Sequence, residues 1–326
     1  MSEGIQVSII CITYNHEKFI SNMLDSVLSQ NVNFEYEILI HDDASKDRTQ
    51  DIIKDYTQKY PNIIKPILQK ENQFSKGINP NITYNYPRIQ GKYVAYCEGD
   101  DYWSDKNKLQ LQYDAMEQNK QCAICVHKTQ CVSISNEKLS REFPPIELNE
   151  GVISSREYIT MELQKVGWLF QTSSYFIRAD VVKEYTSNYV NKYPVGDLPL
   201  VLFSLQKGSC YYIPKKMSCY RVDSGGAMSS LKSRKKKIAH FNKMIAGHKD
   251  FDELTSYKYH DDFLFAILSS EFEINLVKKN YKILISSLYR DVLRKMNIKR
   301  KLIIYLGVLC PTVADYIEEK KNGWTE

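Results

Sequence analysis

The chain has 326 residues, of which 43% are hydrophobic and 25% are charged, a balance that excludes disordered and fibrous classes and suits one large or two modest globular domains. The net charge of +5 is uneven, because residues 231–326 hold 19 Lys and Arg against 12 Asp and Glu. The C-terminal part therefore carries +7 and the remainder −2, an asymmetry that indicates an anionic partner surface for the C-terminal part.

Targeting and membrane patterns are weak. The start, MSEGIQVSII, lacks the basic, apolar and small-residue regions of a secretory signal, so we expect a cytoplasmic protein with reduced cysteines. The most apolar segment, residues 302–310, is shorter than the roughly 20 residues that span a bilayer. The spacing of Cys122, Cys125 and Cys131 is compatible with zinc or with a half-buried strand, and no second Cys or His pair completes four ligands.

Apolar runs alternate with amphipathic segments through the first hundred residues. The runs predict buried strands at residues 7–12, 36–40, 62–68 and 92–97. Helical spacing predicts a helix at 17–30, and a second helix, capped by Ser45 and Asp47, ends at Pro61. Pro66 weakens the third strand or places it at an edge. Strands that alternate with helices predict an α/β fold with a mostly parallel sheet.

The rest of the chain divides near residue 230. A helix containing Leu109 and Met116 is followed by further predicted elements: a strand at 122–134, a helix at 154–164, a strand at 172–178 and a helix at 197–208. Residues 220–230, rich in Gly and Ser, predict a mobile loop. Beyond it, only helical stripes follow: Phe263, Ile267 and Leu268, then Ile283, Leu284, Leu288 and Val292. The predicted domains are 1–230, in two halves (1–120 and 121–230), and a basic helical extension (231–326).

Polar clusters follow three of the predicted strands. They are Thr13, Tyr14 and Asn15 after the first, Asp42 and Asp43 after the second, and Glu98, Asp100 and Asp101 after the fourth. Ligands of open parallel sheets bind beyond the carboxyl ends of the strands, so these clusters predict one site.

Each acidic cluster suits a particular ligand. Asp100 and Asp101 can hold Mg²⁺ or Mn²⁺, whose remaining ligands are diphosphate oxygens. Asp42 and Asp43 can accept hydrogen bonds from a nucleobase or a ribose. Alternatively, Asp100 and Asp101 are turn residues that cap the helix beginning near Lys106. Asp42 and Asp43 could instead form an Asx turn ahead of the second helix.

At this point the sequence resembles a family. The segments VSIICITYN, YEILIHDDASKDRT, GKYVAYCEGDDYWSDKNKLQLQ and VGDLPL are similar to those of the inverting nucleotide-sugar glycosyltransferases of family 2, which have the GT-A fold. Among these, the chain is most similar to bacterial enzymes that build capsular or other cell-surface polysaccharides. The resemblance is strong over residues 5–120, patchier over 150–230 and weak in the C-terminal part.

The resemblance implies that 1–230 is a GT-A glycosyltransferase domain, with 1–120 as its nucleotide-binding half and 121–230 as its acceptor half. It also implies roles for matching residues on the donor side. Thr13 and Tyr14 would line the uridine pocket, Asp42 and Asp43 would contact the uracil, Asp100 would meet ribose or metal, and Asp101 would bind the metal. Glu98 stands where the family usually has Asp, and its role stays open.

The resemblance also implies the chemistry. Asp197, preceded by Gly196 where the family has Glu, would be the general base for a sugar acceptor hydroxyl, or a plain helix N-cap. Arg221 would reach the diphosphate, whereas Asp223 has no assigned role. Trp103 and Trp168 either stack on sugars or belong to the core.

Other functions are open to the same residues. A nucleotidyltransferase would carry a Gly-rich phosphate loop after the first strand, where this chain reads CITYNHEKF. An inactive sugar-nucleotide sensor or scaffold would keep binding without transfer. The basic extension could dock on the anionic cytoplasmic leaflet beside a lipid-linked glycan acceptor, or serve as a helical cap or homodimer element. No nucleic acid partner is predicted.

Overall fold

The computed structural model describes residues 4–188, 192–222, 233–314 and 317. The chain forms two compact units. The first consists of Met1–Tyr158, Trp168–Val190 and Leu200–Ser224, and the second of Ile159–Gly167, Asn191–Pro199 and Gly225–Glu326. The domain boundary predicted near residue 230 lies outside the described residues.

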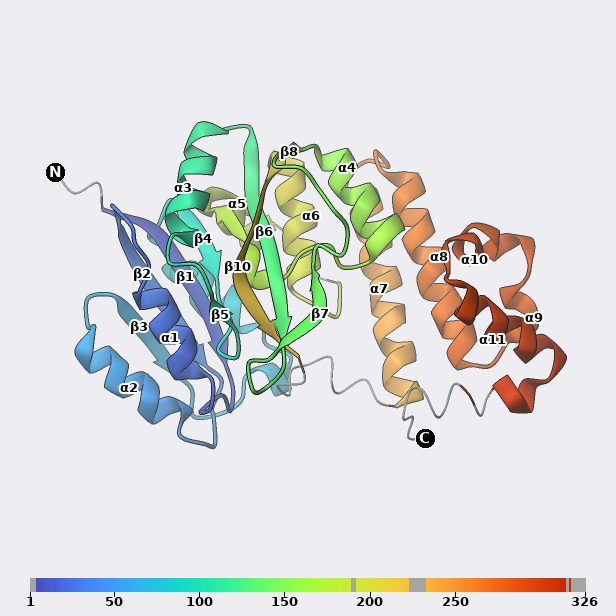
Figure 1. The fold of residues 1–326 in the computed structure, drawn as a ribbon, viewed down its shortest axis with the longest axis horizontal. Coiled ribbons are helices and arrows are strands. Elements are labelled where there is room, and N and C mark those ends of the chain that lie inside the picture. Colours follow the sequence, from blue (N-terminus) through green and yellow to red (C-terminus); the bar gives the residue numbers. More distant parts are fainter. Residues whose placement is uncertain (1–3, 189–191, 223–232, 315–316, 318–326) are drawn as a thin grey trace. The chain divides into compact units, whose positions relative to one another are not determined.

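The first unit is built on one mixed β-sheet (Figure 1). Its strands are β1 (Ile5–Thr13), β2 (Glu35–Asp42), β3 (Ile64–Leu68), β4 (Tyr93–Tyr96), β5 (Tyr102–Trp103), β6 (Cys122–Val132), β7 (Lys138–Phe143), β8 (Gly151–Ile153), β9 (Phe176–Arg178) and β10 (Ser209–Arg221). The strand order is β3-β2-β1-β4-β9-β6-β10-β5, with β7 beside β6 and β8 beside β10.

The four strands predicted from the first hundred residues are parallel neighbours, as expected. The strand that contains Pro66, β3, lies at the sheet edge, which confirms the prediction made from proline. In the parallel register Thr13 lies opposite Asp42, so the polar residues that follow β1 and β2 emerge side by side.

The second half of the sheet was predicted less well. The expected strand at 172–178 is shorter, because Thr172–Ser174 form a 3₁₀ turn before β9, which pairs antiparallel with β4 and β6. β10 was not predicted at all. It runs parallel to β6 and ends at Arg221, so the loop expected from residue 220 begins inside a strand, and its residues 223–230 lie outside the described residues.

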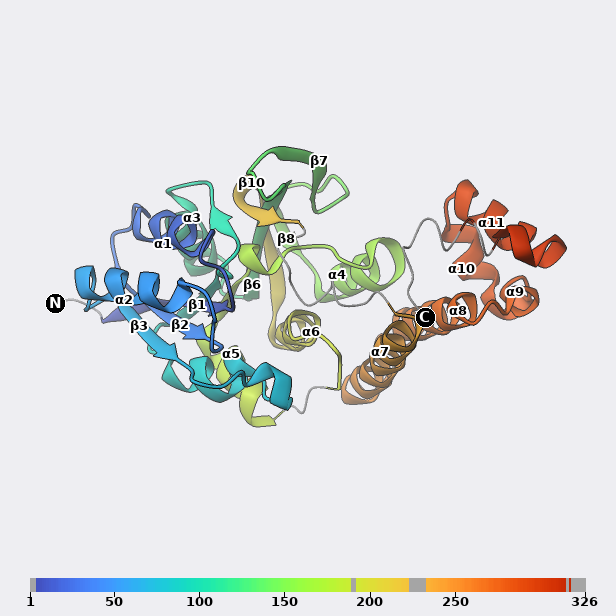
Figure 2. The same cartoon turned by 90° about the horizontal axis from the view of Figure 1, so that it is seen from below.

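Helices cover both faces of the sheet (Figures 1 and 2). They are α1 (Ile20–Leu28), α2 (Thr49–Lys59), α3 (Lys108–Gln118), α4 (Ser155–Thr160), α5 (Ala179–Asn188) and α6 (Asp197–Lys207). Alternate residues of β1, including Val7 and Ile9, pack in one core with Met23 and Leu24 of α1 and with Leu109 of α3. Figure 2 shows α5 on the opposite face.

The described residues of the second unit beyond 233 are helical, as predicted. The helices are α7 (Arg234–Leu254), α8 (His260–Val277), α9 (Tyr281–Leu284), α10 (Arg290–Lys295) and α11 (Ile298–Leu309). The stripe expected over residues 283–292 was wrong, because the helix breaks after Leu284 and leaves Ile283 and Leu288 exposed. Within the described ranges, no helix has the length and apolar character needed to cross a bilayer.

Candidate active site at the strand ends

The acidic turn that follows β4 continues alongside β1. The amide of Gly99 donates to the carbonyl of Ile12 at 3.0 Å, and Asp101 N donates to the carbonyl of Glu98 at 3.0 Å, which closes the turn. Gly99 is required here, since a Cβ at this position would lie 2.5 Å from Thr13 Oγ1. The turn exposes Glu98 and buries Asp100 and Asp101, which are 8% and 1% exposed.

Arg221, at the end of β10, holds this turn in place. Its backbone N–H donates to Asp101 Oδ1 at 3.0 Å, and its guanidinium donates to the carbonyl oxygen of Asp100. The same guanidinium donates to Asn22 Oδ1 at 2.9 Å and Asn136 Oδ1 at 2.7 Å. Its Cζ also lies 4.7 Å from the ring centroid of Phe19. The guanidinium of Arg221 thus connects three separate segments of the first unit.

The charge balance of the turn favours a bound cation. Burial raises the pKa of Asp101 well above its usual value, and the neighbouring carboxylates of Asp100 and Glu98 raise it further. Hydrogen bonding and charge from Arg221 oppose this shift without cancelling it. A divalent cation would stabilise the ionised form, so Asp100 and Asp101 fit such an ion as two oxygen ligands. The described residues contain no group of three or more acidic, His or Cys side chains arranged to hold a metal, so the remaining ligands would come from diphosphate and water.

The acidic pair after β2, Asp42 and Asp43, accepts hydrogen bonds from the neighbouring loops. Asp42 accepts hydrogen bonds from Ser45 N at 3.0 Å and Gln50 Nε2 at 2.6 Å. Asp43 accepts from the backbone amides of Gln73 at 2.7 Å and Phe74 at 3.0 Å. These bonds fix the loops on either side of the strand end, and both carboxylates are buried.

Two aromatic side chains remain accessible next to this pair. Tyr14, which follows β1, is 42% exposed, and Phe74, whose amide binds Asp43, is 64% exposed. Phe74 was missed at the sequence level, because nothing in the polar segment 69–80 marks one aromatic residue as a ligand-facing group. An exposed aromatic ring beside hydrogen-bond acceptors is suited to stacking on a planar base.

His16 was also missed. Its Nε2 lies 3.9 Å from Asp100 Oδ2, and its Nδ1 is a buried atom without a hydrogen-bond partner among the described residues. Thr13 Oγ1 is a second such atom. Both atoms border Gly99, since a Cβ there would come within 2.9 Å of either. Buried polar atoms normally have a hydrogen-bond partner, so Thr13 Oγ1 and His16 Nδ1 mark a place for a polar ligand or water.

The remaining predicted residues lie elsewhere. Asp197 is the first residue of α6, whose residues up to Pro199 belong to the second unit and the rest to the first. It is half-buried and accepts a hydrogen bond from the Leu198 amide at 2.9 Å. Trp103 is buried and donates to the carbonyl of Tyr96 at 3.3 Å, so it belongs to the core. Trp168 is half-buried, 5.4 Å from the ring of Phe143. Asp223 lies outside the described residues.

The arrangement defines an α/β protein of the GT-A type, with a mostly parallel sheet, a polar site at the strand ends and a C-terminal helical region. Solved structures agree on this fold. TarS of S. aureus in complex with UDP-GlcNAc is 16% identical and has a TM-score of 0.57, with 98% of this chain and 93% of that chain covered. The mannosyltransferase PcManGT of Pyrobaculum calidifontis, in complex with GDP-Man and Mn²⁺, is 12% identical, with a TM-score of 0.52 and coverage of 93% and 86%.

The family follows from the sequence comparison. Residues 8–185 match the profile described as "Glycosyl transferase family 2", and the chain belongs to this family. An uncharacterized protein of Mycobacterium tuberculosis is 31% identical over 236 residues, and the chain spans 63% of that relative's length and 71% of its own. TuaG of Bacillus subtilis, which is named for teichuronic acid biosynthesis as a glycosyltransferase, is 35% identical over 118 residues, covering 36% of this chain and 44% of TuaG.

Proposed function

We propose that the protein transfers a hexose from a UDP-sugar to a hydroxyl of a growing cell-surface glycan. The observation that carries this proposal is the acidic turn of Asp100 and Asp101 at the carboxyl end of β4, in a chain of glycosyl transferase family 2. Fold alone would not suffice, because related folds host many chemistries. The UDP-GlcNAc bound to TarS and the teichuronic acid role in the name of TuaG support the donor and the glycan class.

The donor side of the site has assignable roles. Thr13, Tyr14 and Phe74 would contact the base, with Tyr14 and Phe74 as the accessible rings. Asp43 and Asp42 would hold the loops that form this pocket and, as the family resemblance implies, offer acceptor lone pairs to the uracil. Both carboxylates are buried, and their contact with the uracil stays a prediction.

The diphosphate side depends on the acidic turn. Asp101 and Asp100 would hold Mn²⁺ or Mg²⁺, and such an ion, when bound, neutralises charge on the departing diphosphate. The Mn²⁺ of PcManGT supports this choice. Arg221 would keep the turn in the required shape through its bonds to Asp100 and Asp101. Its direct contact with the diphosphate stays a prediction.

The reaction would be a single displacement with inversion. The oxygen of an acceptor hydroxyl forms a bond to the anomeric carbon, the bond from that carbon to the diphosphate oxygen breaks, and UDP leaves with the electron pair. Asp197, half-buried at the first turn of α6, would accept the hydroxyl proton. A positioned general base of this kind typically contributes about 10² to 10⁴ in rate.

The place of action would be the cytoplasmic face of the cell membrane. A lipid-linked glycan would present its acceptor hydroxyl at this membrane face. The net charge of +7 over residues 231–326 supports peripheral attachment to anionic lipids. A homodimer through the helical extension is the competing role for the same residues.

Radiolabelled UDP-sugars, tested as a panel with Mn²⁺ and again with EDTA, provide the decisive experiment. We expect donor hydrolysis or transfer for one sugar, lost with EDTA. Binding of UDP without any turnover would instead support a sensor. Full activity in EDTA would refute the metal assignment while leaving the transferase assignment intact.

A further inference from the structure

Helix α11 packs on the second unit through one side only. Ile304 and Gly307 are buried on that side, and a Cβ added to Gly307 would lie 2.3 Å from the ring of Tyr281. Arg300 of α11 forms an ion pair with Glu273 of α8, with 2.5 Å between Nη2 and Oε1. This close approach and the half-buried ion pair account for the packing face of α11.

The opposite side of α11 is also apolar, but it is exposed. The apolar stripe of α11 consists of Ile298, Leu302, Tyr305 and Leu309, which are 50–83% exposed. Their spacing of four, three and four residues places them along one side of the helix, over about 17 Å. A helix on a protein surface normally shows polar residues on its outer side, so a continuous exposed stripe indicates an interaction surface.

Positive charge surrounds this stripe. Residues 278–301 contain nine Lys and Arg and a single acidic residue, Asp291. Within the described part of the chain, six of the nine form no ion pair: Lys278, Lys282, Arg290, Lys295, Lys299 and Lys301. Lys299 and Lys301 flank the stripe on α11 itself. An apolar strip between uncompensated cations is the pattern of helices that lie in the interface of anionic membranes.

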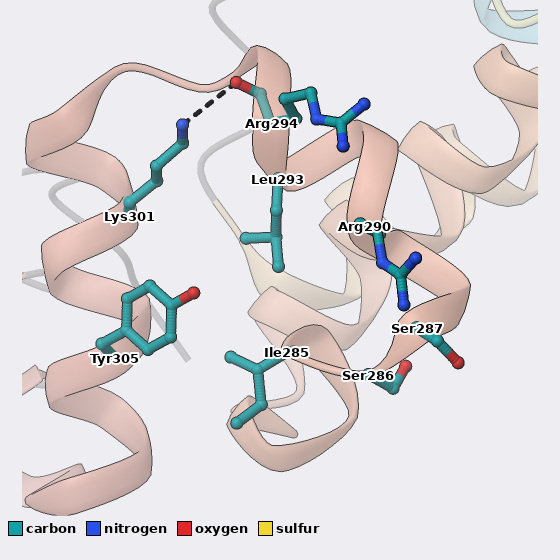
Figure 3. A pocket seen from close by; sticks show the side chains of 8 residues that line it. All are labelled: Ile285, Ser286, Ser287, Arg290, Leu293, Arg294, Lys301 and Tyr305. Atoms are coloured by element: carbon teal, nitrogen blue, oxygen red, sulfur yellow. Dashed lines mark hydrogen bonds between the residues drawn. The ribbon is translucent and has the colours of Figure 1, made fainter.

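A pocket of about 320 Å³ lies next to the stripe (Figure 3). Ile285, Leu293 and Tyr305 point toward one another inside it. Arg290, Arg294 and Lys301 also line it, and Lys301 Nζ donates to the carbonyl of Arg294 at 3.0 Å.

The same pocket contains an unpaired polar atom. The hydroxyl oxygen of Ser286 is buried and, within the described residues, has no hydrogen-bond partner. Cationic side chains together with a spare hydroxyl suit a phosphate group.

We propose that the α9–α11 surface docks on an anionic phospholipid bilayer, with the apolar stripe at the boundary of headgroups and acyl chains and a lipid phosphate at Arg290 and Arg294. This inference extends the membrane part of the proposed function and names the surface responsible. A second copy of the chain fits less well, because the facing surfaces would both carry the excess of cations counted above.

Vesicle sedimentation of the full chain tests the proposal, with phosphatidylcholine vesicles compared with vesicles containing phosphatidylglycerol, at low and high salt. We expect binding to the anionic vesicles only, weakened by salt. The Arg290→Gln/Arg294→Gln variant should bind about 25-fold more weakly, at about fivefold per lost charge. The Leu302→Ser/Leu309→Ser variant should lose at least tenfold.

Two control variants match these changes in the first unit. Lys54→Gln/Lys59→Gln removes the same charge from exposed positions on α2, and Ile134→Ser removes one apolar side chain that is 51% exposed. Both should bind vesicles as the unaltered protein does. Equal losses in the controls, or no binding to anionic vesicles at low salt, would overturn the proposal.

Two further measurements separate this proposal from its competitors. A dimer in solution that the Leu302→Ser/Leu309→Ser variant abolishes, without vesicle binding by the unaltered protein, would assign the stripe to a second copy and overturn the proposal. UDP-sugar hydrolysis without lipid tests the enzyme separately. Failure there with intact vesicle binding would sink the transferase assignment and leave the lipid surface standing.

Discussion

Lys108 offers the sharpest test of the structure, because a lysine is enclosed in an apolar core. It lies in the first turn of α3, is fully buried, and donates from Nζ to Gln112 Oε1 at 2.7 Å. Its Nζ also lies 4.0 Å from the ring centroid of Trp103. Burial lowers the pKa of Lys108 from 10.5 to about 7.

The shift has a defined effect on stability. Between pH 7 and 10.5 the unfolded chain binds a proton at Lys108 that the folded chain does not, so the free energy of unfolding rises with pH across this window. A difference of 3.5 pKa units corresponds to about 5 kcal/mol, which burial of Lys108 costs at pH 7 and below. Lys108→Met removes this cost but leaves Gln112 Oε1 without its donor, a loss of about 1–3 kcal/mol. We therefore expect a net gain of about 2–4 kcal/mol at pH 6.5.

Urea unfolding followed by tryptophan fluorescence measures the effect, since Trp103 lies against the substituted side chain. The advantage of Lys108→Met over the unaltered chain should shrink by about 3 kcal/mol between pH 6.5 and 9.5. Lys59→Met, an exposed substitution on α2, should show no such pH dependence. If the advantage of Lys108→Met stayed constant with pH, the ammonium of Lys108 would not be titrating in this window, and the reasoning would fail.

Three further substitutions test the site and the packing. Asp197→Asn should lower transfer by about 10² to 10⁴ with unchanged UDP binding, and turnover that survived would remove Asp197 from the base role. Asp101→Asn should weaken Mn²⁺-dependent donor binding in calorimetry yet raise the melting temperature at pH 7, because it removes a carboxylate whose pKa is raised by burial. A lower melting temperature would contradict this. Gly307→Ala should destabilise the second unit by about 1–3 kcal/mol in thermal melts, whereas Val313→Ala, at an exposed position, should not.

The parallel half of the sheet was predictable because its signals are local. Each of its strands is a short apolar run, and Pro66 alone indicated which one lies at the edge. The polar residues after β1, β2 and β4 followed from the rule that parallel strands end together. The direction of each side chain is not encoded in these local patterns. The two hydrogen bonds that Asp43 accepts from backbone amides were therefore not predicted.

β10 was not predicted, because its sequence lacks the regular alternation of a strand. Its sequence, SCYYIPKKMSCYR, is interrupted by Pro214 and two lysines, which are exposed where the pairing with β6 shifts register. Such a bulge removes the alternation by which a strand is recognised. The same strand delivers Arg221 to the acidic turn, 120 residues earlier in the chain, and no local pattern encodes that contact.

Arg221 is a positively charged side chain beside the buried carboxylates of the acidic turn, but it does not cancel the effect of their burial. Glu98 avoids the cost of burial by facing solvent, whereas the buried carboxylate of Asp101 accepts a hydrogen bond from the backbone amide of Arg221. The guanidinium itself binds the carbonyl of Asp100 and two asparagines, and these bonds fix the shape of the turn. The bonds from Arg221 hold the turn in shape. Since the pKa of Asp101 stays raised despite Arg221, a further cation would stabilise the ionised carboxylate. A site held in shape before its ion arrives loses little conformational freedom on binding, which favours capture of a metal–diphosphate donor.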